Sequence, residues 1–382
     1  MSEADRTARR LARFGRTQIG GVPQPSDDED MPRVHMTRDR AIFFGLFVAS
    51  AIALLYFVLP HLAGLRKTWD QVDRGNPAWI VGAGALELLS FGGYVMLFRT
   101  VFLRDSRPGR IDWATSYEIT MAGLAATRLF AAAGSGGVAL TAWALRRSGM
   151  ERRAVASRMV AFMTILYGVY MLVLVVVGIG LRTGLLPGGG SFAITVLPAT
   201  FGASAIALML GMSLLPADVE RRLESWSRRG GRGAKILARL ATVPALAASG
   251  VRGALAIVRE RDVRVLGALA WWGFDVAVLW ASFHAFGAAP PFFVITMAYF
   301  VGMLANVLPL PGGIGGVDGG MIGALIAFGV DGGLAVVAVL VYRGFSFWLP
   351  TIPGAIAYFQ LRRRVRGWTA EASPPARSAV IL

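Results

Sequence analysis

Long runs of apolar residues alternate along this chain with short segments rich in arginine. A helix needs about twenty apolar residues to cross roughly 30 Å of hydrocarbon. Six apolar runs reach that length: residues 41–65, 78–103, 159–181, 191–215, 265–286 and 334–360. The pattern therefore predicts an all-α polytopic membrane protein with about six full transmembrane helices.

The arginine-rich segments predict which side of the membrane each connection faces. Four of them lie between the apolar runs or after the last one: residues 104–110, 146–153, 216–264 and 362–366. Because Lys and Arg are enriched in cytoplasmic loops, all four are expected in the cytoplasm. Residues 1–40 are expected to form a disordered cytoplasmic tail, and residues 361–382 a basic cytoplasmic one. Residues 41–360 would then form the transmembrane domain of a multi-pass protein of the cell membrane.

Two apolar segments are too short to cross the membrane twice. Residues 114–145 lie between two basic loops, so the chain must return to the side that it left, yet about thirty residues cannot supply two full spans. When the crossings are counted from the basic loops, residues 291–330 start and end on the exterior side. The motif PLPGGIGGVDGG at residues 309–320 divides them into two arms. Each segment is therefore predicted to form a re-entrant helical hairpin, the first entering from the cytoplasm and the second from the exterior.

The two predicted hairpins share a pattern of small residues at a constant offset of 179 positions. Seven residues recur in this way: Gly123, Ala126, Leu129, Gly134, Gly136, Gly137 and Val138 return as Gly302, Ala305, Leu308, Gly313, Gly315, Gly316 and Val317. A composition rich in Gly, Ala and Leu raises the number of chance matches, but the charge pattern independently gives the two copies opposite orientations. Together these features predict an inverted-repeat arrangement, which together with broken helices near the midplane is typical of transporters.

Composition agrees with a membrane protein and excludes several functional classes. Of the 382 residues, 55% are hydrophobic and 16% charged, and the mean hydropathy is +0.56. The net charge of +16 is concentrated at the ends of apolar runs, so we attribute it to topology and expect no nucleic-acid partner. The chain has no cysteine, which excludes disulfides, zinc thiolates and a cysteine nucleophile. Its three histidines are too scattered to predict a metal site, and we expect no cofactor.

The glycine-rich motif breaks the backbone inside the predicted membrane domain. Unpaired backbone groups in hydrocarbon cost several kcal/mol each, so irregular backbone survives only where protein or a water-filled cavity surrounds it. Glycines allow positive φ, and a helix that begins around Gly319 would direct its N–H groups and positive dipole end at the protein centre. An anionic lipid headgroup would fit there; the alternative is that the glycines serve only close helix packing. The candidate headgroup ligands in this region are Asn306, Gly312, Gly313, Gly315, Gly316 and Asp318.

Ionisable residues within the apolar segments are the other candidates for headgroup binding. Arg343 lies near mid-bilayer in the last predicted span, and Arg128 lies near the tip of the first hairpin. Each costs about 2.5–3.5 kcal/mol to insert, so each is expected to face an inward groove and to have a partner. A guanidinium can hold a phosphate with two parallel hydrogen bonds, whereas the alternative role for these arginines is a structural ion pair. The available carboxylates are Glu87, Asp275 and Asp318, and the first two are candidates for coupling or ion pairing.

Residues 216–264 form the longest predicted cytoplasmic connection. It contains the segments ADVERRLESWSRR and AKILARLATVPALAASGVRGALAIVRERD, both rich in arginine and apolar residues. Amphipathic helices of this kind lie well against anionic lipid headgroups. We therefore predict surface helices that anchor this loop at the membrane interface.

The second half of the chain resembles the flippase-like family that is named after the transmembrane region of lysylphosphatidylglycerol synthase. The family motif Leu-Pro-x-Pro-Gly-Gly-x-Gly, followed by an acid, is matched by LPLPGGIGGVDGG, with Asp318 where glutamate is common. Further matches to a Gly-Val pair, a Tyr-Arg pair and a Pro-Gly pair are Gly329, Val330, Tyr342, Arg343, Pro353 and Gly354. The resemblance covers about residues 41–360 and implies a lipid-translocating membrane domain without the aminoacyl-transferring domain of the full synthases.

The first half departs from the family pattern. Members commonly carry a Pro-x-Arg-x-Gly-Glu type of sequence, whereas this chain has AAAGSGGVALTAWALRRSGM, which keeps the glycines and the pair Arg146 and Arg147. The proline and the acid are missing, and Ala139 stands where the acid would be expected. This half therefore lacks the carboxylate that the family pattern would place at Ala139.

Three functions remain open. The leading one is a translocase without an enzymatic step, whose partners are membrane lipids and whose substrate is a phospholipid or a lipid-linked anionic precursor such as a polyprenyl phosphate. The second is a membrane-embedded enzyme, such as a glycosyltransferase with a polyprenyl-phosphate donor, which would use Asp70 and Asp73 of the first external loop. The third is a structural or regulatory membrane subunit. The sequence is compatible with a homo-oligomer.

Overall fold

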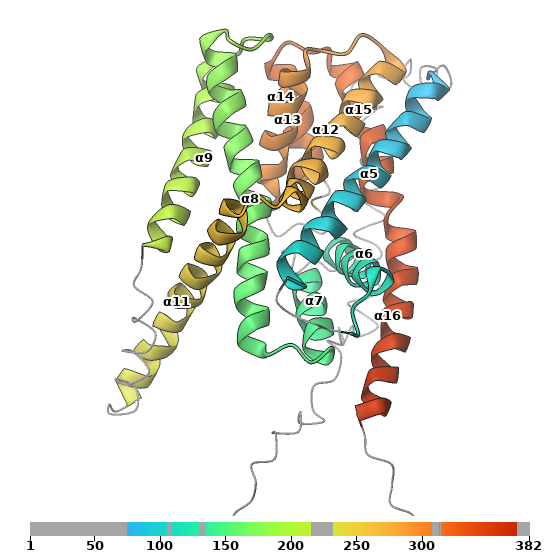
Figure 1. The fold of residues 1–382 in the computed structure, drawn as a ribbon. Coiled ribbons are helices and arrows are strands. Elements are labelled where there is room, and N and C mark those ends of the chain that lie inside the picture. Colours follow the sequence, from blue (N-terminus) through green and yellow to red (C-terminus); the bar gives the residue numbers. More distant parts are fainter. Residues whose placement is uncertain are drawn as a thin grey trace, which may run out of the picture. The chain divides into compact units, whose positions relative to one another are not determined.

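A computed structural model describes residues 75–104, 109–129, 135–214, 232–307, 313 and 315–372. All of them belong to one compact unit, residues 36–382. Every regular element in the described ranges is a helix (Figure 1), as the apolar pattern predicts. The first predicted span, residues 41–65, and the tail of residues 1–40 lie outside the described residues.

Five helical stretches among the described residues are long and apolar enough to cross a membrane. They are α5 (Pro77–Phe102), α8 (Arg152–Thr183), α9 (Phe192–Ser213), the 3₁₀ turn η2 (Val263–Leu266) continued by α12 (Gly267–Phe286), and the stretch Gly332–Trp368. The last stretch contains α15 (Gly332–Arg343), the π-helical segment η5 (Gly344–Trp348) and most of α16 (Thr351–Ala372). Five of the six predicted spans are therefore found as long apolar helices, and this is a multi-pass membrane protein.

Two of these helices extend past the predicted ends of their spans. Helix α8 begins at Arg152, seven residues before the predicted apolar run, and α16 continues through the arginine-rich segment of residues 362–366 to Ala372. A helix satisfies its own backbone hydrogen bonds, so it does not have to end where the hydrocarbon does. Hydropathy therefore located the spans but placed the start of α8 too late and the end of α16 too early.

Two pairs of shorter helices occupy the segments that were predicted to be hairpins. In the first pair, α6 (Trp113–Leu129) packs against α7 (Ser135–Arg147). In the second, α13 (Phe292–Leu304) with the 3₁₀ turn η3 (Ala305–Val307) packs against α14 (Gly316–Ala327). In Figure 1 the first pair lies in the lower half of the view and the second in the upper half, and α5 and α12 pack against each other between them.

Glycines bring the two helices of each pair into close contact. A Cβ atom on Gly302 would lie 2.7 Å from the Met321 backbone N, so α13 and α14 approach each other at van der Waals distance. In the first pair, a Cβ on Gly137 would lie 2.4 Å from the Gly123 backbone O. Small residues at such crossings let helix backbones pack closely in membranes. The packing role that the sequence left open for its glycines is therefore present at these positions.

Helix α11 (Arg232–Arg259) differs from the predicted surface helices. Its described side chains bury one face at Ala248, Val251, Ala254 and Ile257, and the helix packs against α8 and α9. The repeated spacing of three residues keeps these side chains on neighbouring positions of the helix surface. The C-terminal half of this predicted loop is thus part of the packed helical domain, because its apolar face meets other helices; residues 216–231 lie outside the described residues.

Helix α6 is joined to α16 by a two-point ion pair. Arg364 donates from Nε to Glu118 Oε2 at 2.9 Å and from Nη2 to Glu118 Oε1 at 2.7 Å. The Glu118 side chain is 7% exposed, whereas that of Arg364 is 37% exposed. Such forked pairs hold a fixed relative position of two elements. The pair therefore fixes the first helical pair to the C-terminal helix.

Glu118→Ala should lower the free energy of unfolding by about 1–3 kcal/mol, because it removes two charge-assisted hydrogen bonds from a partly buried arginine. The measurement is unfolding in mixed detergent micelles followed by circular dichroism. The control is Glu260→Ala, whose ion pair with Arg104 is more exposed and should matter less. Equal losses for the two variants would contradict a specific role for the contact between α6 and α16.

Candidate functional site

Five ionisable side chains from five helices form one group, which we call the charge cluster, with three buried carboxylates and two partly buried arginines. Its members are Glu87 on α5, Arg128 on α6, Asp275 on α12, Asp318 on α14 and Arg343 on α15. The three carboxylates are 1–6% exposed. Arg128 interacts electrostatically with Glu87, Asp275 and Arg343, and Arg343 with Asp318 and Asp275. The five ionisable residues among those proposed from sequence for headgroup binding and for coupling therefore meet in one place.

Arg343 and Asp318 form an ion pair within the cluster. Arg343 donates from Nε to Asp318 Oδ1, and their side chains are 12% and 1% exposed. Arg343 thus pairs with the acid of the glycine-rich motif. Helix α15 ends at Arg343 and the chain continues as the π-helical segment η5. Segments of π-helix are frequent at functional sites.

Asp318 also caps the helix to which it belongs. Its Oδ2 accepts the backbone N–H of Gly315 at 2.9 Å, and α14 begins at Gly316. The prediction that this helix begins around Gly319 was therefore wrong, because the carboxylate reaches back and orders an extra turn. The anion at this helix N-terminus is the protein's own carboxylate, so an external anion would have to compete with Asp318.

The glycines of the motif have the backbone geometry that their type predicts. Gly313 has φ of +67° and Gly315 has φ of +82°, a conformation that side chains disfavour. A Cβ on Gly313 would lie 2.6 Å from Asn306 Oδ1, so Asn306 at the end of the preceding arm lies against the motif. Gly316 starts the helix, and Gly312 lies outside the described residues.

Asp275 is held by two tyrosines that the sequence did not indicate as site residues. Tyr299 on α13 and Tyr342 on α15 both donate their hydroxyl hydrogens to Asp275 Oδ2, the latter at 3.1 Å. Both tyrosines are fully buried. Tyr342 was noted only for its family resemblance, and Tyr299 stands inside an apolar run, where nothing in the sequence separates it from a packing residue.

Some polar atoms of the cluster lack partners. Among the described residues, Glu87 Oε2, Arg128 Nη1 and Asp275 Oδ1 are buried and have no hydrogen-bond partner, and the same holds for Ser346 Oγ of η5. Buried polar groups are nearly always paired in native proteins, so unpaired ones indicate strain, a functional role or a site for a bound partner. The cluster therefore has spare hydrogen-bonding capacity on both a cation and two carboxyl groups.

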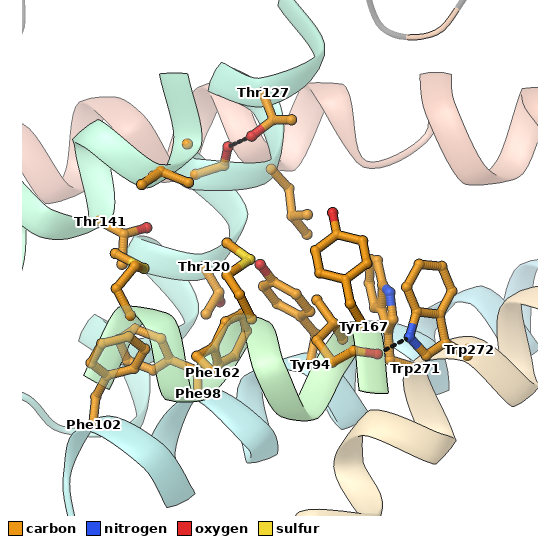
Figure 2. A pocket seen from close by; sticks show the side chains of 17 residues that line it. Tyr94, Phe98, Phe102, Thr120, Thr127, Thr141, Phe162, Tyr167, Trp271 and Trp272 are labelled. Atoms are coloured by element: carbon orange, nitrogen blue, oxygen red, sulfur yellow. Dashed lines mark hydrogen bonds between the residues drawn. The ribbon is translucent and has the colours of Figure 1, made fainter. Parts of the chain in front are cut away.

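A cavity of about 480 Å³ lies among α5, α6, α7, α8 and α12. In Figure 2 the rings of Trp271 and Trp272 mark one end and Phe102 and Thr141 the other. Its lining is mainly aromatic and aliphatic. The hydroxyl of Thr127, which also lines the cavity, donates its hydrogen to the backbone O of Gly123. None of the charge-cluster residues lines this cavity. It is thus an apolar pocket, in contrast to the cationic groove expected around Arg128 and Arg343.

Outside the membrane spans, the first helical pair starts from a capping residue. Asp112 accepts the backbone N–H of Thr115 at 2.7 Å, directly before α6. Hydrogen bonds from Thr115 hold the pKa of Asp112 below its usual value, because they favour the ionised form. Groups of Asp and Glu residues that could hold a metal ion are absent from the described residues.

Comparison with known proteins identifies the family. The model of the lysylphosphatidylglycerol synthase TM region matches residues 42–354, which is most of the chain. This chain belongs to the lysylphosphatidylglycerol synthase TM region family. The resemblance inferred from LPLPGGIGGVDGG and from the pair Tyr342 and Arg343 is therefore confirmed, including its extent along the chain.

Members of the UPF0104 membrane proteins are similar to this chain. One from Methanothermobacter thermautotrophicus is 30% identical over 168 residues, or 41% of this chain and 48% of that relative, so the chain spans about half the relative's length. A longer alignment to a protein of the same description and organism is 25% identical and covers 82% of this chain and 94% of the relative. One from Methanocaldococcus jannaschii is 31% identical over 24% of this chain and 28% of its own length. No solved structure matches.

Proposed function

We propose that this member of the lysylphosphatidylglycerol synthase TM region family is a translocase for a phospholipid or a lipid-linked anionic precursor, and that it performs no enzymatic step. The observation that carries the proposal is the charge cluster. There, two partly buried arginines interact, one at the end of α6 and one at the end of α15, and the buried Nη1 of Arg128 has no hydrogen-bond partner among the described residues. An arginine with unused donors inside a membrane domain is suited to a phosphate that enters from lipid.

The start points of the helices support an inverted repeat with two re-entrant hairpins. When the first half is shifted by 179 positions, α6 starts at the same residue as α13, α7 starts two residues before α14, and α8 starts one residue before α15. The offset came from the glycine pattern of the sequence alone. Agreement across three consecutive helices favours a true repeat of structural units over chance matches in composition.

The packing partners of the two halves also correspond. Helix α5 contacts α6 and α8 in the first half, as α12 contacts α13 and α15 in the second. Helix α6 packs against α16, the continuation of α15, and α13 packs against α8 in the same manner. Their places in the lower and upper halves of Figure 1 fit hairpins that enter from opposite sides. In such transporters, one half rocks against the other around a fixed site.

The proposed mechanism is an exchange of anions at the arginines. The headgroup phosphate first engages the unused donor of Arg128, and it then competes with the carboxylate of Asp318 for Arg343. Release of Asp318 also frees the Gly315 N–H at the start of α14 for the phosphate. Rocking of the two halves would expose the held headgroup to each leaflet in turn, while the hydrocarbon chains stay in the bilayer.

Topology and partners follow the same proposal. The first hairpin enters from the cytoplasm, both termini are cytoplasmic, and the partners are membrane lipids and other copies of this chain. A structural or regulatory subunit is the second candidate function, because the ion pair between Arg343 and Asp318 would also stabilise a protein that transports nothing. For a glycosyltransferase, Asp70 and Asp73 would be decisive, and both lie outside the described residues.

The test is reconstitution into liposomes with a panel of fluorescent anionic lipids and polyprenyl phosphates. Wild-type protein should exchange at least one of them between leaflets, and Arg128→Ala should slow that exchange by about tenfold or more, because a charge-assisted contact to phosphate is lost. The control is Arg182→Ala, an exposed arginine at the end of α8, which should exchange lipid at the wild-type rate.

Two results would count against the proposal. Exchange rates that match protein-free vesicles for every lipid in the panel would remove the translocase. A change in the mass of the added lipid would instead identify an enzyme, since a translocase changes only the leaflet in which the lipid resides.

A further inference from the structure

The carboxyl groups of Glu87 and Asp275 form a buried pair, which we call the carboxyl pair. They come from α5 and α12, the two helices that pack against each other at the centre of the repeat, and their side chains are 1% and 6% exposed. We propose that the carboxyl pair binds one proton in the resting protein and takes up a second when an anionic headgroup binds. The coupling part rests on the proposed translocase function; the resting proton does not.

The pattern of hydrogen bonds around the carboxyl pair indicates that one of the two carboxyl groups carries a proton. Asp275 Oδ2 already accepts from Tyr299 and Tyr342, whereas Asp275 Oδ1 and Glu87 Oε2 have no donor among the described residues. The two carboxyl groups lie within hydrogen-bonding reach of each other. Two carboxylates cannot hydrogen-bond unless one of them carries a hydrogen. A single proton held between them supplies the missing donor and removes the repulsion of two like charges.

The net charge of the charge cluster also indicates one bound proton. The charge cluster contains three carboxylates and two arginines, so with every group ionised it carries a net charge of −1. An unbalanced charge buried away from water costs several kcal/mol. One bound proton makes the cluster neutral. The unpaired oxygens identify the carboxyl pair as the place for it, because Asp318 uses Oδ1 on Arg343 and Oδ2 on Gly315.

Other titratable groups around the pair do not provide an alternative place for this proton. Arg128 faces it from α6, Tyr299 from α13, and Tyr342 and Arg343 from α15. Both tyrosines already donate to Asp275, and both arginines stay charged in proteins. From α8, Tyr170 donates its hydroxyl hydrogen to Phe300 O at 2.6 Å and is thereby used elsewhere.

Binding of a phosphate would change the number of protons at the pair. When the phosphate engages Arg128, the guanidinium stabilises the phosphate in place of the remaining carboxylate of the pair, and the neutral cluster gains one negative charge. A proton from water then binds that carboxylate oxygen, forming an O–H bond and restoring neutrality. When the headgroup leaves, the proton returns to water. One proton therefore moves in the same direction as each singly charged headgroup.

The first experiment reads proton coupling in proteoliposomes. The probe is fluorescent phosphatidylglycerol, with an internal pH dye and an imposed pH gradient across the vesicle. Acid on one side should drive the lipid to the opposite leaflet, and a lipid gradient should move protons into or out of the vesicle. The double variant Glu87→Gln and Asp275→Asn keeps the size of both side chains but leaves no carboxyl group in the pair to take up a proton, so lipid movement should lose its response to the gradient. Asp262→Asn, a partly exposed acid before η2 and outside the charge cluster, should behave as wild type.

The second experiment reads the resting proton without transport. Infrared spectra of the purified full chain at neutral pH should contain the band of a protonated carboxyl group in an apolar site. The band should shift in heavy water and should be reduced in both Glu87→Gln and Asp275→Asn. If the wild-type spectrum lacks this band, the proposal that the carboxyl pair holds a proton at rest is overturned, even if neither variant folds.

The outcomes separate this inference from the proposed function. Lipid exchange that ignores the pH gradient and moves no protons overturns the coupling while leaving a translocase in place. If no lipid is exchanged, both the translocase and the coupling are overturned. The infrared band alone then tests whether the carboxyl pair holds a proton in the resting protein. Exchange with proton movement in wild type, with the proton movement lost in the double variant Glu87→Gln and Asp275→Asn and kept in Asp262→Asn, is the result that the inference predicts.

Discussion

Arg343→Ala should lower the free energy of unfolding by about 3–5 kcal/mol, one of the two largest effects that we expect in this protein. The substitution removes the partner of Asp318, whose side chain is 1% exposed, and so leaves an uncompensated charge inside the membrane domain. It also removes the polar contact that joins the end of α15 to the start of α14. Unfolding in mixed micelles, followed by circular dichroism, measures the loss.

A double variant separates stability from function at this ion pair. Arg343→Met combined with Asp318→Asn removes both charges, and the asparagine oxygen can still accept the Gly315 N–H. Replacing a whole buried ion pair by neutral groups is often close to neutral, so this variant should recover most of the stability lost by Arg343→Ala. If the arginine binds headgroups, the folded double variant should still fail to exchange lipid. Full exchange by this variant would support a purely structural ion pair.

Gly302→Ala should have the second large effect, a loss of about 3 kcal/mol of unfolding free energy, and it should also slow lipid exchange. The new Cβ would lie 2.3 Å from Met321 Cγ and 2.7 Å from the Met321 backbone N. A flexible side chain could move aside, but the backbone of α14 could not do so without separating the second helical pair. Overpacking of this kind typically costs about 1–3 kcal/mol, and the contact with backbone places this site at the upper end.

Gly323→Ala is the matched control for that substitution. Gly323 lies on the same pair of helices, in α14, but a Cβ built on it meets nothing within 4 Å. Alanine there should leave stability unchanged or raise it slightly, since glycine weakens a helix interior. Equal effects at Gly302 and Gly323 would show that the close approach of α13 and α14 is not what the glycine provides.

Much of the fold could be predicted because the membrane imposes a simple length rule. Apolar runs of about twenty residues located five described spans, and the segments at residues 114–145 and 291–330 were correctly expected to contain pairs of shorter helices. Helix ends were less predictable, since Arg152 continues α8 beyond the apolar run. The packing of α11 on α8 was missed because an arginine-rich amphipathic helix suits a lipid surface as well as a protein one.

The sequence predicted which ionisable residues belong to the candidate site, but it did not predict which of them pair with each other. A charge inside an apolar run is costly, and that cost alone pointed to Arg128, Arg343, Glu87 and Asp275. Which carboxylate meets which arginine depends on how separate helices pack, and hydropathy carries no information about that. For the same reason Tyr299 was missed, and the apolar cavity, built from five helices, was not foreseen.

The most direct measurement for the central claim is leaflet exchange of a fluorescent anionic lipid in proteoliposomes. It compares wild type with the Arg343→Met and Asp318→Asn double variant, after both are shown to be folded. The account predicts rapid exchange with wild-type protein and the protein-free rate with the double variant, because the headgroup loses its arginine. Rapid exchange with both, or with neither, would contradict a headgroup site at the charge cluster.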